Sequence, residues 1–187
     1  GGDELFGGYP TYQANIWSKF LFRYMPTILL TLIQKFNANI SFSKNNYTLF
    51  EQVDLFLKAK SIPSYLRHLY WMGQLSGDVS DYLCIPYRST ADFRSQSKLN
   101  KLKLDELNQL MFTDYTTYLR DNLLVKTERD SIYNSLEVRV PFLDPAIINS
   151  AFGTEGRKKV NIWQTKQTLR SLGIGKLPEY ILKRKKK

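Results

Sequence analysis

The chain has 187 residues, 43% of them hydrophobic, and a formal charge of +10 at pH 7. This length and composition suffice for a folded core and exclude a chain that is disordered by composition. The positive charge raises nucleic acid or a membrane surface as partners. However, it gathers in two runs, at residues 157–159 and 183–187. We interpret the second run mainly as a solvated tail and expect neither partner.

The single cysteine, Cys84, leaves no disulfide framework and no thiolate metal site. The opening GGDE lacks the basic and apolar regions of a signal peptide. The longest apolar stretch, near residues 28–33, is far shorter than the roughly 20 residues of a membrane-spanning helix. These features predict a soluble, cytoplasmic protein. Both ends of the sequence look cut, so we expect the chain to be a piece of a longer domain.

Helical periodicity dominates the first half of the chain. Apolar side chains recur at helical spacing in four stretches, which Pro26 and a break at residues 61–63 separate. The predicted helices cover residues 12–24, 28–36, 49–57 and 66–72. The stretch from Pro86 to Ser97 predicts a loop.

The second half begins with the longest periodic stretch, which predicts helix from Leu104 to Tyr118 and again over residues 122–134. Residues 137–142 alternate instead, which predicts an extended segment with its apolar side chains buried. Few strands are expected elsewhere, so the predicted fold is mostly helical.

Helix boundary signals mark the last third. Asp144 and Pro145 predict a helix start, with an acidic N-cap and proline in the first turn, and this helix should end at Gly153. Thr165 is predicted to cap a further helix that stops at Gly173. Pro178 should open one more short helix.

The opening GGDELFGGY is the first motif with chemical potential. Its glycines permit a tight turn with positive φ, and Asp3 and Glu4 present carboxylates beside it. Hard oxygen ligands of this kind suit Mg²⁺, which completes its coordination with phosphate and water oxygens. A solvated acidic turn that caps the following helix is the competing interpretation.

The second motif is EVRVPFLD, residues 137–144. Charges beside such an apolar stretch are expected to pair with each other or with a ligand. We favour a structural Glu137–Arg139 pair that braces the segment.

Together these motifs resemble a known family. GGDELFGGYPTY, YLRDNLLVKTERDSIYNSLEVRVPFLD, TKQTLRSL and LPEYILKRKKK are similar, in the same order, to segments of bacterial glutamine-hydrolysing asparagine synthetases. The resemblance spans both ends of the chain. It implies that residues 1–187 are the helical C-terminal portion of an α/β PP-loop ATP pyrophosphatase domain, with few or no strands.

The resemblance also implies a reaction. The family uses ATP and Mg²⁺ to activate aspartate as β-aspartyl-AMP, and ammonia from an N-terminal glutaminase domain of the same chain then displaces AMP. The full-length protein would thus be a ligase of asparagine biosynthesis, and a homodimer is possible. Relatives that amidate other carboxylates or close β-lactam rings remain an alternative.

Site residues follow from the matched positions. Asp3 matches the acidic residue that helps to hold Mg²⁺ and pyrophosphate, and Glu4 and Tyr9 match residues near the acceptor pocket. Lys126 takes the place of a basic residue proposed to contact the amino-acid substrate. Arg129 follows one turn later on the same helix.

The final segment fits the family pattern of Arg, any residue, Lys. Arg184 and Lys186 occupy these positions, so Lys186 corresponds to the lysine that neutralises the departing pyrophosphate. Because adenylation develops negative charge on that group, a fixed cation there is catalytic. Lys166 and Arg170 share a predicted helix face and would add positive potential nearby.

Some family features are missing from this sequence. The phosphate-binding Ser-Gly-Gly-Leu-Asp-Ser signature is absent, as are the glutaminase domain and its N-terminal cysteine. Glu128 and Asp130 also replace the usual aspartate and apolar residue. We therefore expect these 187 residues alone to be inactive and to bind ATP weakly.

Two other classes of protein were weighed. GGDEL differs by one letter from the GGDEF signature of diguanylate cyclases, but there the turn lies between strands, and here a helical pattern follows. A basic helical interaction module is the more remote alternative, which no nucleic-acid recognition motif supports. The lone His68 and the tryptophans Trp17, Trp71 and Trp163 are interpreted as core or interface residues.

Overall fold

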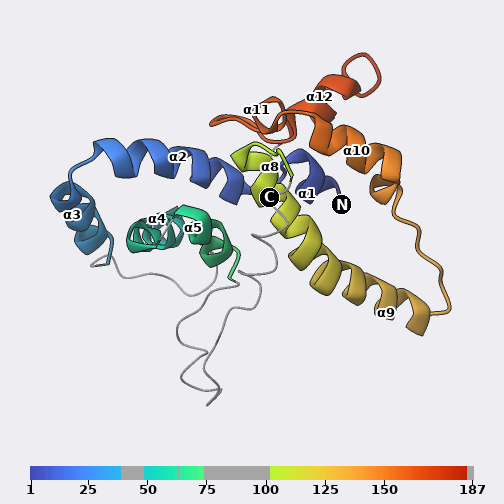
Figure 1. Ribbon diagram of the computed structural model, residues 1–187, viewed down its shortest axis with the longest axis horizontal. Helices are drawn as coiled ribbons and strands as arrows, with labels where there is room; N and C mark the ends of the chain where they lie inside the picture. Colours follow the sequence, from blue (N-terminus) through green and yellow to red (C-terminus); the bar gives the residue numbers. More distant parts are fainter. Residues whose placement is uncertain (39–48, 63, 74–101, 185–187) are drawn as a thin grey trace. The chain divides into compact units, whose positions relative to one another are not determined.

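A computed structural model describes residues 1–38, 49–62, 64–73 and 102–184 (Figure 1). This part of the chain is mostly helical and contains no β-strand, as the sequence predicted. The predicted loop at residues 86–97, Cys84 and Lys186 lie outside it. None of the described helices is long and apolar enough to cross a membrane. The chain divides into two compact units, the first with residues 1–12 and the residues from 102 onward, the second with residues from 13 to 73.

The first unit is built around a five-residue helix, α1 (Gly2–Phe6). It contacts α8, η2, α10 and α12. The remaining elements of this unit follow in chain order: the start of α2 (Pro10–Tyr24), α8 (Glu106–Asp114), η2 (Tyr115–Leu124), α9 (Val125–Tyr133), η3 (Pro141–Leu143), α10 (Pro145–Gly153), α11 (Gly156–Lys159), α12 (Gln167–Gly173) and α13 (Glu179–Lys183).

The core of this unit lies between α1 and α10. Leu5 and Phe6 of α1 pack with Ala151 of α10, and all three are buried. Burying each of the two large side chains contributes roughly 1.5–3 kcal/mol. Partly buried side chains from η2, η3, α10 and α12 surround them: Tyr115, Leu143, Ile147, Ile148, Phe152 and Leu169. These contacts anchor α1, and with it the turn of residues 7 and 8 that follows.

A continuous helical rod runs from α8 through η2 to α9 (Figure 1). Its middle section, η2, has π-helical hydrogen bonding. Thr116 and Thr117 donate their hydroxyl protons to main-chain carbonyls four residues earlier, at 2.8 and 2.7 Å. Single π-helical turns occur often at functional sites. Here the π-helical section faces α1.

The second unit contains the rest of α2, α3 (Thr27–Ala38), α4 (Leu49–Lys58), η1 (Ala59–Ser61) and α5 (Ser64–Trp71). Aromatic rings connect three of these helices. Phe56 lies 5.0 Å from Phe22 and stacks on Trp71 at 5.6 Å. His68 is fully buried here, in agreement with its interpretation as a core residue.

Helix boundaries test the local predictions. Asp144 caps α10, accepting a hydrogen bond from the backbone N–H of Ala146 at 2.8 Å, with Pro145 in the first turn. The predicted cap at Thr165 is wrong. Lys166 is the N-cap of α12, in a left-handed conformation with φ of 55°, and makes no side-chain cap. Because Lys166 is left-handed, the chain enters α12 by a different turn from the one that a capping residue at position 165 would make.

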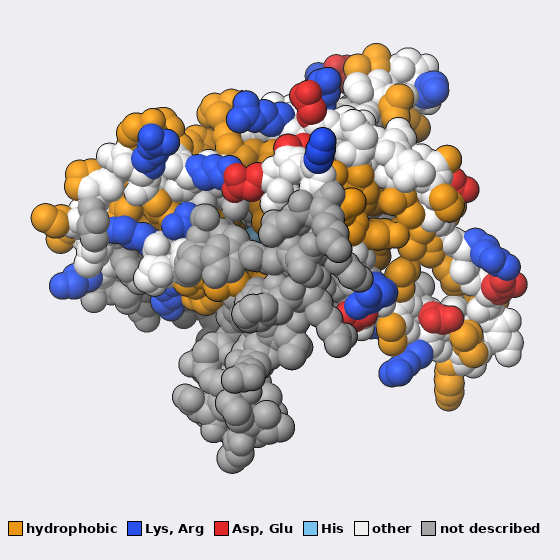
Figure 2. Space-filling model, viewed as in Figure 1, with side chains coloured by type: hydrophobic (Ala, Val, Ile, Leu, Met, Phe, Trp, Pro, Cys, Tyr) orange, Lys and Arg blue, Asp and Glu red, His pale blue; other side chains and the backbone are white. Residues whose placement is uncertain are grey.

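The EVRVPFLD segment is not buried as predicted. Val138 is 47% exposed and Phe142 38% exposed, while Trp163 is 78% exposed and no core residue. Residues 136–140 form neither helix nor strand, and the backbone is extended at Val140. Figure 2 shows hydrophobic side chains gathered on the visible face over α9, α10 and the segment between them. The alternating pattern predicts an extended backbone. Whether its apolar side chains are buried depends on which parts of the protein pack against them.

Candidate functional site

The opening turn is shaped by two consecutive glycines. Gly7 ends α1 in the left-handed region, with φ of 68°, where a residue with a Cβ is strained. The backbone N–H of Gly8 then donates to the Asp3 carbonyl at 2.8 Å. The turn thus folds back over the residue that carries the first carboxylate.

Gly8 lies against the side chain of Asp3. A Cβ at Gly8 would come within 1.9 Å of Asp3 Oδ1 and 2.5 Å of the Lys166 Cε atom. The absence of a side chain is therefore required for these two groups to meet.

An ion pair joins Asp3 to Lys166. The Lys166 Nζ atom lies 2.5 Å from Asp3 Oδ1, and the side chains are 35% and 21% exposed for the lysine and the aspartate. Lys166 has one of two non-glycine backbones with positive φ in the described residues. Such conformations persist where the surrounding structure enforces them. The ion pair places a cation and a carboxylate together at a partly open surface.

Arg170 forms hydrogen bonds with the C-terminal end of α13. Its guanidinium donates to the carbonyl oxygens of Thr165 and Arg184, both at 3.1 Å, and to that of Leu182. We expected Arg170 to add positive potential near the site. Its hydrogen bonds also connect α12 to the end of α13.

Glu4 points into the protein rather than toward solvent. Its side chain is buried, and Tyr9 donates its hydroxyl proton to Glu4 Oε1. Burial raises the pKa of Tyr9, and the hydrogen bond to Glu4 raises it further. Tyr9 therefore remains a protonated donor throughout the neutral range.

A second phenol–carboxylate pair lies next to the first. Tyr12 donates to Asp114 Oδ2 at 2.6 Å, and both side chains are fully buried. Burial raises the pKa of Tyr12, and the neighbouring Asp114 carboxylate adds to the effect. The Tyr9 ring lies 6.0 Å from that of Tyr12 and meets Tyr118 edge-on at 6.1 Å.

Lys159 is fully buried in the same unit. Its Nζ atom donates to Asn108 Oδ1 at 2.6 Å and lies 5.3 Å from the centre of the Phe152 ring. Burial lowers the pKa of Lys159 to about 8. The next residue, Val160, packs beside Gly7 of the opening turn, so Lys159 is adjacent in sequence to a residue that borders this turn.

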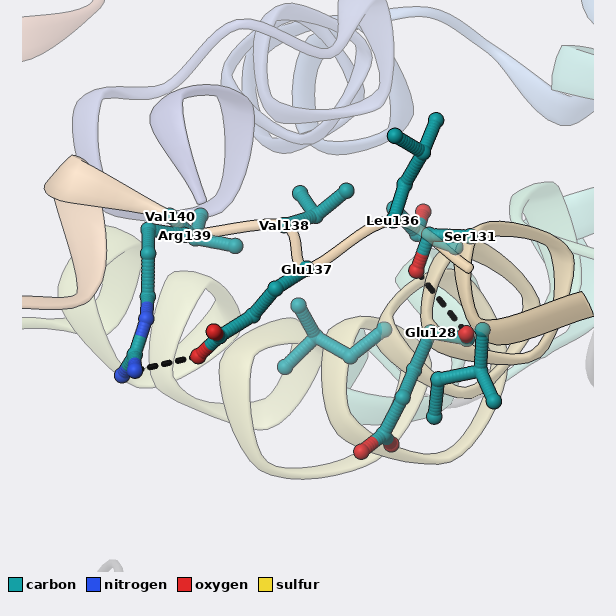
Figure 3. Close-up of a pocket in the computed structure, with 10 residues that line it drawn as sticks. Glu128, Ser131, Leu136, Glu137, Val138, Arg139 and Val140 are labelled. Atoms are coloured by element: carbon teal, nitrogen blue, oxygen red, sulfur yellow. Dashed lines mark hydrogen bonds and ion pairs between the residues drawn. The ribbon is translucent and has the colours of Figure 1, made fainter. Parts of the chain in front are cut away.

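A pocket of about 360 Å³ lies between α9 and residues 136–140, which include the first half of the EVRVPFLD motif (Figure 3). Glu137 and Arg139 point toward one another and form the predicted ion pair. Glu128 and Ser131 line the α9 side. The lining combines apolar side chains with Glu128 and with the Glu137–Arg139 pair, whose two charges offset each other.

The predicted residues are therefore only partly gathered. Asp3, Glu4 and Tyr9 share the opening turn, whereas Lys126 and Arg129 are exposed on α9 and do not line the pocket. Lys186 lies outside the described residues. Lys166 was predicted only to add positive potential nearby, and its position in TKQTLRSL was the one signal. Tyr12, Asp114 and Tyr118 were missed.

The oxygen donors at the turn suit a hard divalent cation. The described residues contain no cluster of three or more His, Cys, Asp or Glu side chains that could hold a metal. Mg²⁺ commonly takes one or two protein carboxylates, with phosphate and water oxygens as its other ligands. A partly exposed Asp3 beside a lysine fits a site of that kind, completed by a polyphosphate.

Fold and site together describe a helical segment whose opening acidic turn meets a lysine from the penultimate helix. The chain belongs to the asparagine synthase family, whose family model matches residues 1–187. Glutamine-hydrolysing asparagine synthetase 1 of Bacillus subtilis (strain 168) is 28% identical over 189 residues, covering 100% of this chain and 29% of the relative.

Other relatives carry a similar description. Putative glutamine-hydrolysing asparagine synthetases of Mycobacterium bovis and Mycobacterium tuberculosis are 27% identical over 186 residues, covering 100% of this chain and 28% of theirs. The chain thus spans less than a third of the length of these relatives. No solved structure matches it significantly.

Proposed function

We propose that this chain is part of an ATP-dependent amidotransferase that converts aspartate to asparagine. The observation that carries the proposal is the opening turn, where Lys166 pairs with the Asp3 carboxylate at a partly open surface and Gly8 leaves room for both groups. The family match over the whole chain supports the same assignment. The turn would contribute one carboxylate and one cation to a magnesium–polyphosphate site.

The proposed reaction has two steps. An oxygen of the aspartate side-chain carboxylate attacks the α-phosphorus of ATP, and the bond to the bridging oxygen breaks to release pyrophosphate. Ammonia from glutamine then attacks the acyl carbon of β-aspartyl-AMP, loses a proton and expels AMP. The products are asparagine, AMP and pyrophosphate.

Each predicted residue has a place in this proposal. Asp3 would hold Mg²⁺, which when bound offsets negative charge on the phosphates. Lys186 would neutralise the departing pyrophosphate, and a fixed cation stabilises that charge as it develops. Glu4 and Tyr9 would form the acceptor side of the turn. Lys126 and Arg129 would supply positive charge to the amino-acid substrate from α9.

The remaining parts of the reaction belong to other segments of the longer protein. We assign residues 1–187 to a partial synthetase domain, with the phosphate-binding signature and the glutaminase domain elsewhere in the same polypeptide. These residues alone should neither make asparagine nor bind ATP·Mg²⁺ at micromolar affinity. Calorimetric titration of the isolated segment tests this, and a micromolar dissociation constant would contradict it.

The proposed reaction itself is tested on the full-length protein. Pyrophosphate release should require ATP, Mg²⁺ and aspartate together, and asparagine should accumulate when glutamine is added. Asp3→Asn should lower kcat for pyrophosphate release at least about a hundredfold, because charge stabilisation in the transition state is lost. Asp121→Asn is the control, since Asp121 forms only an exposed pair with Arg120. Release that ignores aspartate would refute the assignment.

A further inference from the structure

Three tyrosines and two buried carboxylates form a cluster behind the opening turn. The tyrosine cluster consists of Tyr9, Tyr12, Tyr118, Glu4 and Asp114. It joins two parts of the chain that are far apart in sequence, the first twelve residues and the junction of α8 with η2. No residue role described so far accounts for Tyr12, Asp114 or Tyr118.

The hydrogen bond between Tyr12 and Asp114 is the deepest part of the cluster. Both side chains are fully buried, and the donor and acceptor oxygens are 2.6 Å apart. A short hydrogen bond to a buried carboxylate is stronger than one between neutral groups. It therefore fixes the first turn of α2 against the end of α8.

Tyr118 contacts Tyr9, which directly follows the opening turn. The π-helical section η2 begins directly after Asp114, and the Tyr118 ring meets Tyr9 edge-on with planes at 79°. Tyr12 touches the same ring from its own helix, with planes at 44°. Contacts from two elements leave Tyr9 little freedom to rotate, because edge-on aromatic pairs have a preferred geometry.

The orientation of Tyr9 sets that of Glu4. Tyr9 donates to Glu4 Oε1, and Glu4 follows Asp3 directly in α1. We infer that Asp114, Tyr12 and Tyr118 are positioning residues, which hold Tyr9, hydrogen-bonded to the buried Glu4, in the orientation needed to bind the acceptor amino acid. This inference rests on the proposed function, because it assumes that Glu4 and Tyr9 form the acceptor side.

The charge state of the cluster supports this role. Burial raises the pKa of both Tyr9 and Tyr12, so both phenols stay protonated and donate to the carboxylates at neutral and mildly alkaline pH. The geometry of the cluster should therefore change little over the pH range in which such an enzyme works.

The kinetic test uses the full-length protein and three variants. Tyr12→Phe removes the hydroxyl that donates to Asp114, and Tyr118→Ala removes the ring that contacts Tyr9. Each should raise KM for aspartate about tenfold or more while KM for ATP changes less than about twofold, because only the acceptor side is displaced. Tyr118→Phe keeps the ring and should restore a KM near the wild-type value.

A matched control separates positioning from general damage. Tyr24→Ala truncates an exposed tyrosine at the end of α2 and should leave both KM values unchanged. If Tyr12→Phe fails to fold, Tyr118→Ala still decides the question. Equal changes in the two KM values, or no change in Tyr118→Ala, would overturn the inference.

A second measurement needs no turnover. Amide hydrogen exchange over α1, residues 2–6, should be faster in Tyr12→Phe and Tyr118→Ala than in wild type and in Tyr118→Phe. Unaltered exchange in both variants would overturn the positioning role. If wild type releases no pyrophosphate with aspartate, the proposed function fails, and the exchange measurement still decides whether the cluster positions the turn.

Discussion

Lys159 is the residue whose surroundings depart furthest from those of its type. Lysine is almost never fully buried without a charged partner. Here the ammonium group has a neutral amide oxygen, a thioether sulfur at 4.0 Å and an aromatic ring around it. Burial therefore disfavours the protonated form and lowers the pKa to about 8, although the attraction of the Asp105 carboxylate partly offsets this effect.

This burial makes the stability of the protein depend on pH. The lysine pKa is about 8 when folded and 10.5 when unfolded, so between these values the unfolded state binds more protons. The free energy of unfolding should rise with pH across this window, by at most about 3 kcal/mol. Below pH 8 both states are protonated, so the folded state bears the full cost of the buried charge.

Lys159→Met should remove this dependence. We expect the variant to be about 1–2 kcal/mol more stable than wild type at pH 7, because a buried charge is replaced by an apolar group of similar length. The difference should shrink toward pH 9.5. Urea unfolding at several pH values measures it, with Lys158→Met as the exposed control. Parallel stability curves for Lys159→Met and wild type would contradict the argument.

Among the elements, α10 and α13 have starts that could be read directly from the sequence, and α13 begins directly after Pro178 as predicted. An acidic N-cap and proline in the first turn act within a few residues, so the prediction needs no knowledge of the tertiary structure. The structure confirms both features. The start of α12 could not be predicted in this way, because the left-handed backbone of Lys166 accompanies its ion pair with a residue far away in the sequence.

Asp144→Ala should shorten or fray α10. Loss of the side-chain acceptor for the Ala146 N–H costs about 1 kcal/mol in the free energy of unfolding. Asp144→Asn retains an acceptor and should retain most of the stability. Chemical denaturation together with hydrogen exchange in the first turn of α10 measures the effect. An Asp144→Ala protein as stable as Asp144→Asn would show that the cap contributes nothing.

The same limit applies to the candidate site. Periodicity predicted the helices that carry Lys126 and Arg129, and short-range pairing predicted the Glu137–Arg139 contact, since both depend on neighbours along the chain. The Asp3–Lys166 contact depends on how α1 packs against the start of α12, and the Tyr12–Asp114 contact depends on how the first turn of α2 packs against α8. No spacing rule in a single sequence connects such positions.

Taken as a whole, the molecule exposes many large apolar side chains. On α9 and the segment after it, Ile132 is 65% exposed, Tyr133 90% and Leu136 63%. Further exposed apolar side chains lie on and around α12 and α13: Leu172, Ile174, Leu177, Tyr180 and Ile181. Contiguous apolar patches usually mark surfaces that other protein covers.

The isolated segment should therefore self-associate. Analytical ultracentrifugation is expected to show species larger than a monomer, in amounts that rise with protein concentration. Replacing Ile132 and Leu136 together by lysine should shift the distribution toward monomer, because charge replaces apolar area. Asp130→Asn on the same helix is the control and should leave it unchanged. A wild-type segment that stays monomeric at all concentrations would contradict the prediction.

The hydrogen bonds of Arg170 have a consequence for both ends of the chain. Arg170 donates hydrogen bonds to the carbonyl oxygens of Leu182 and Arg184 and so connects the last described residues to α12. Lys166, directly before α12, forms the ion pair with Asp3. Order at one terminus thus favours order at the other. Thermodynamic coupling is reciprocal. A ligand that binds at Asp3 would therefore also stabilise α13, and a ligand that binds at α13 would stabilise the opening turn.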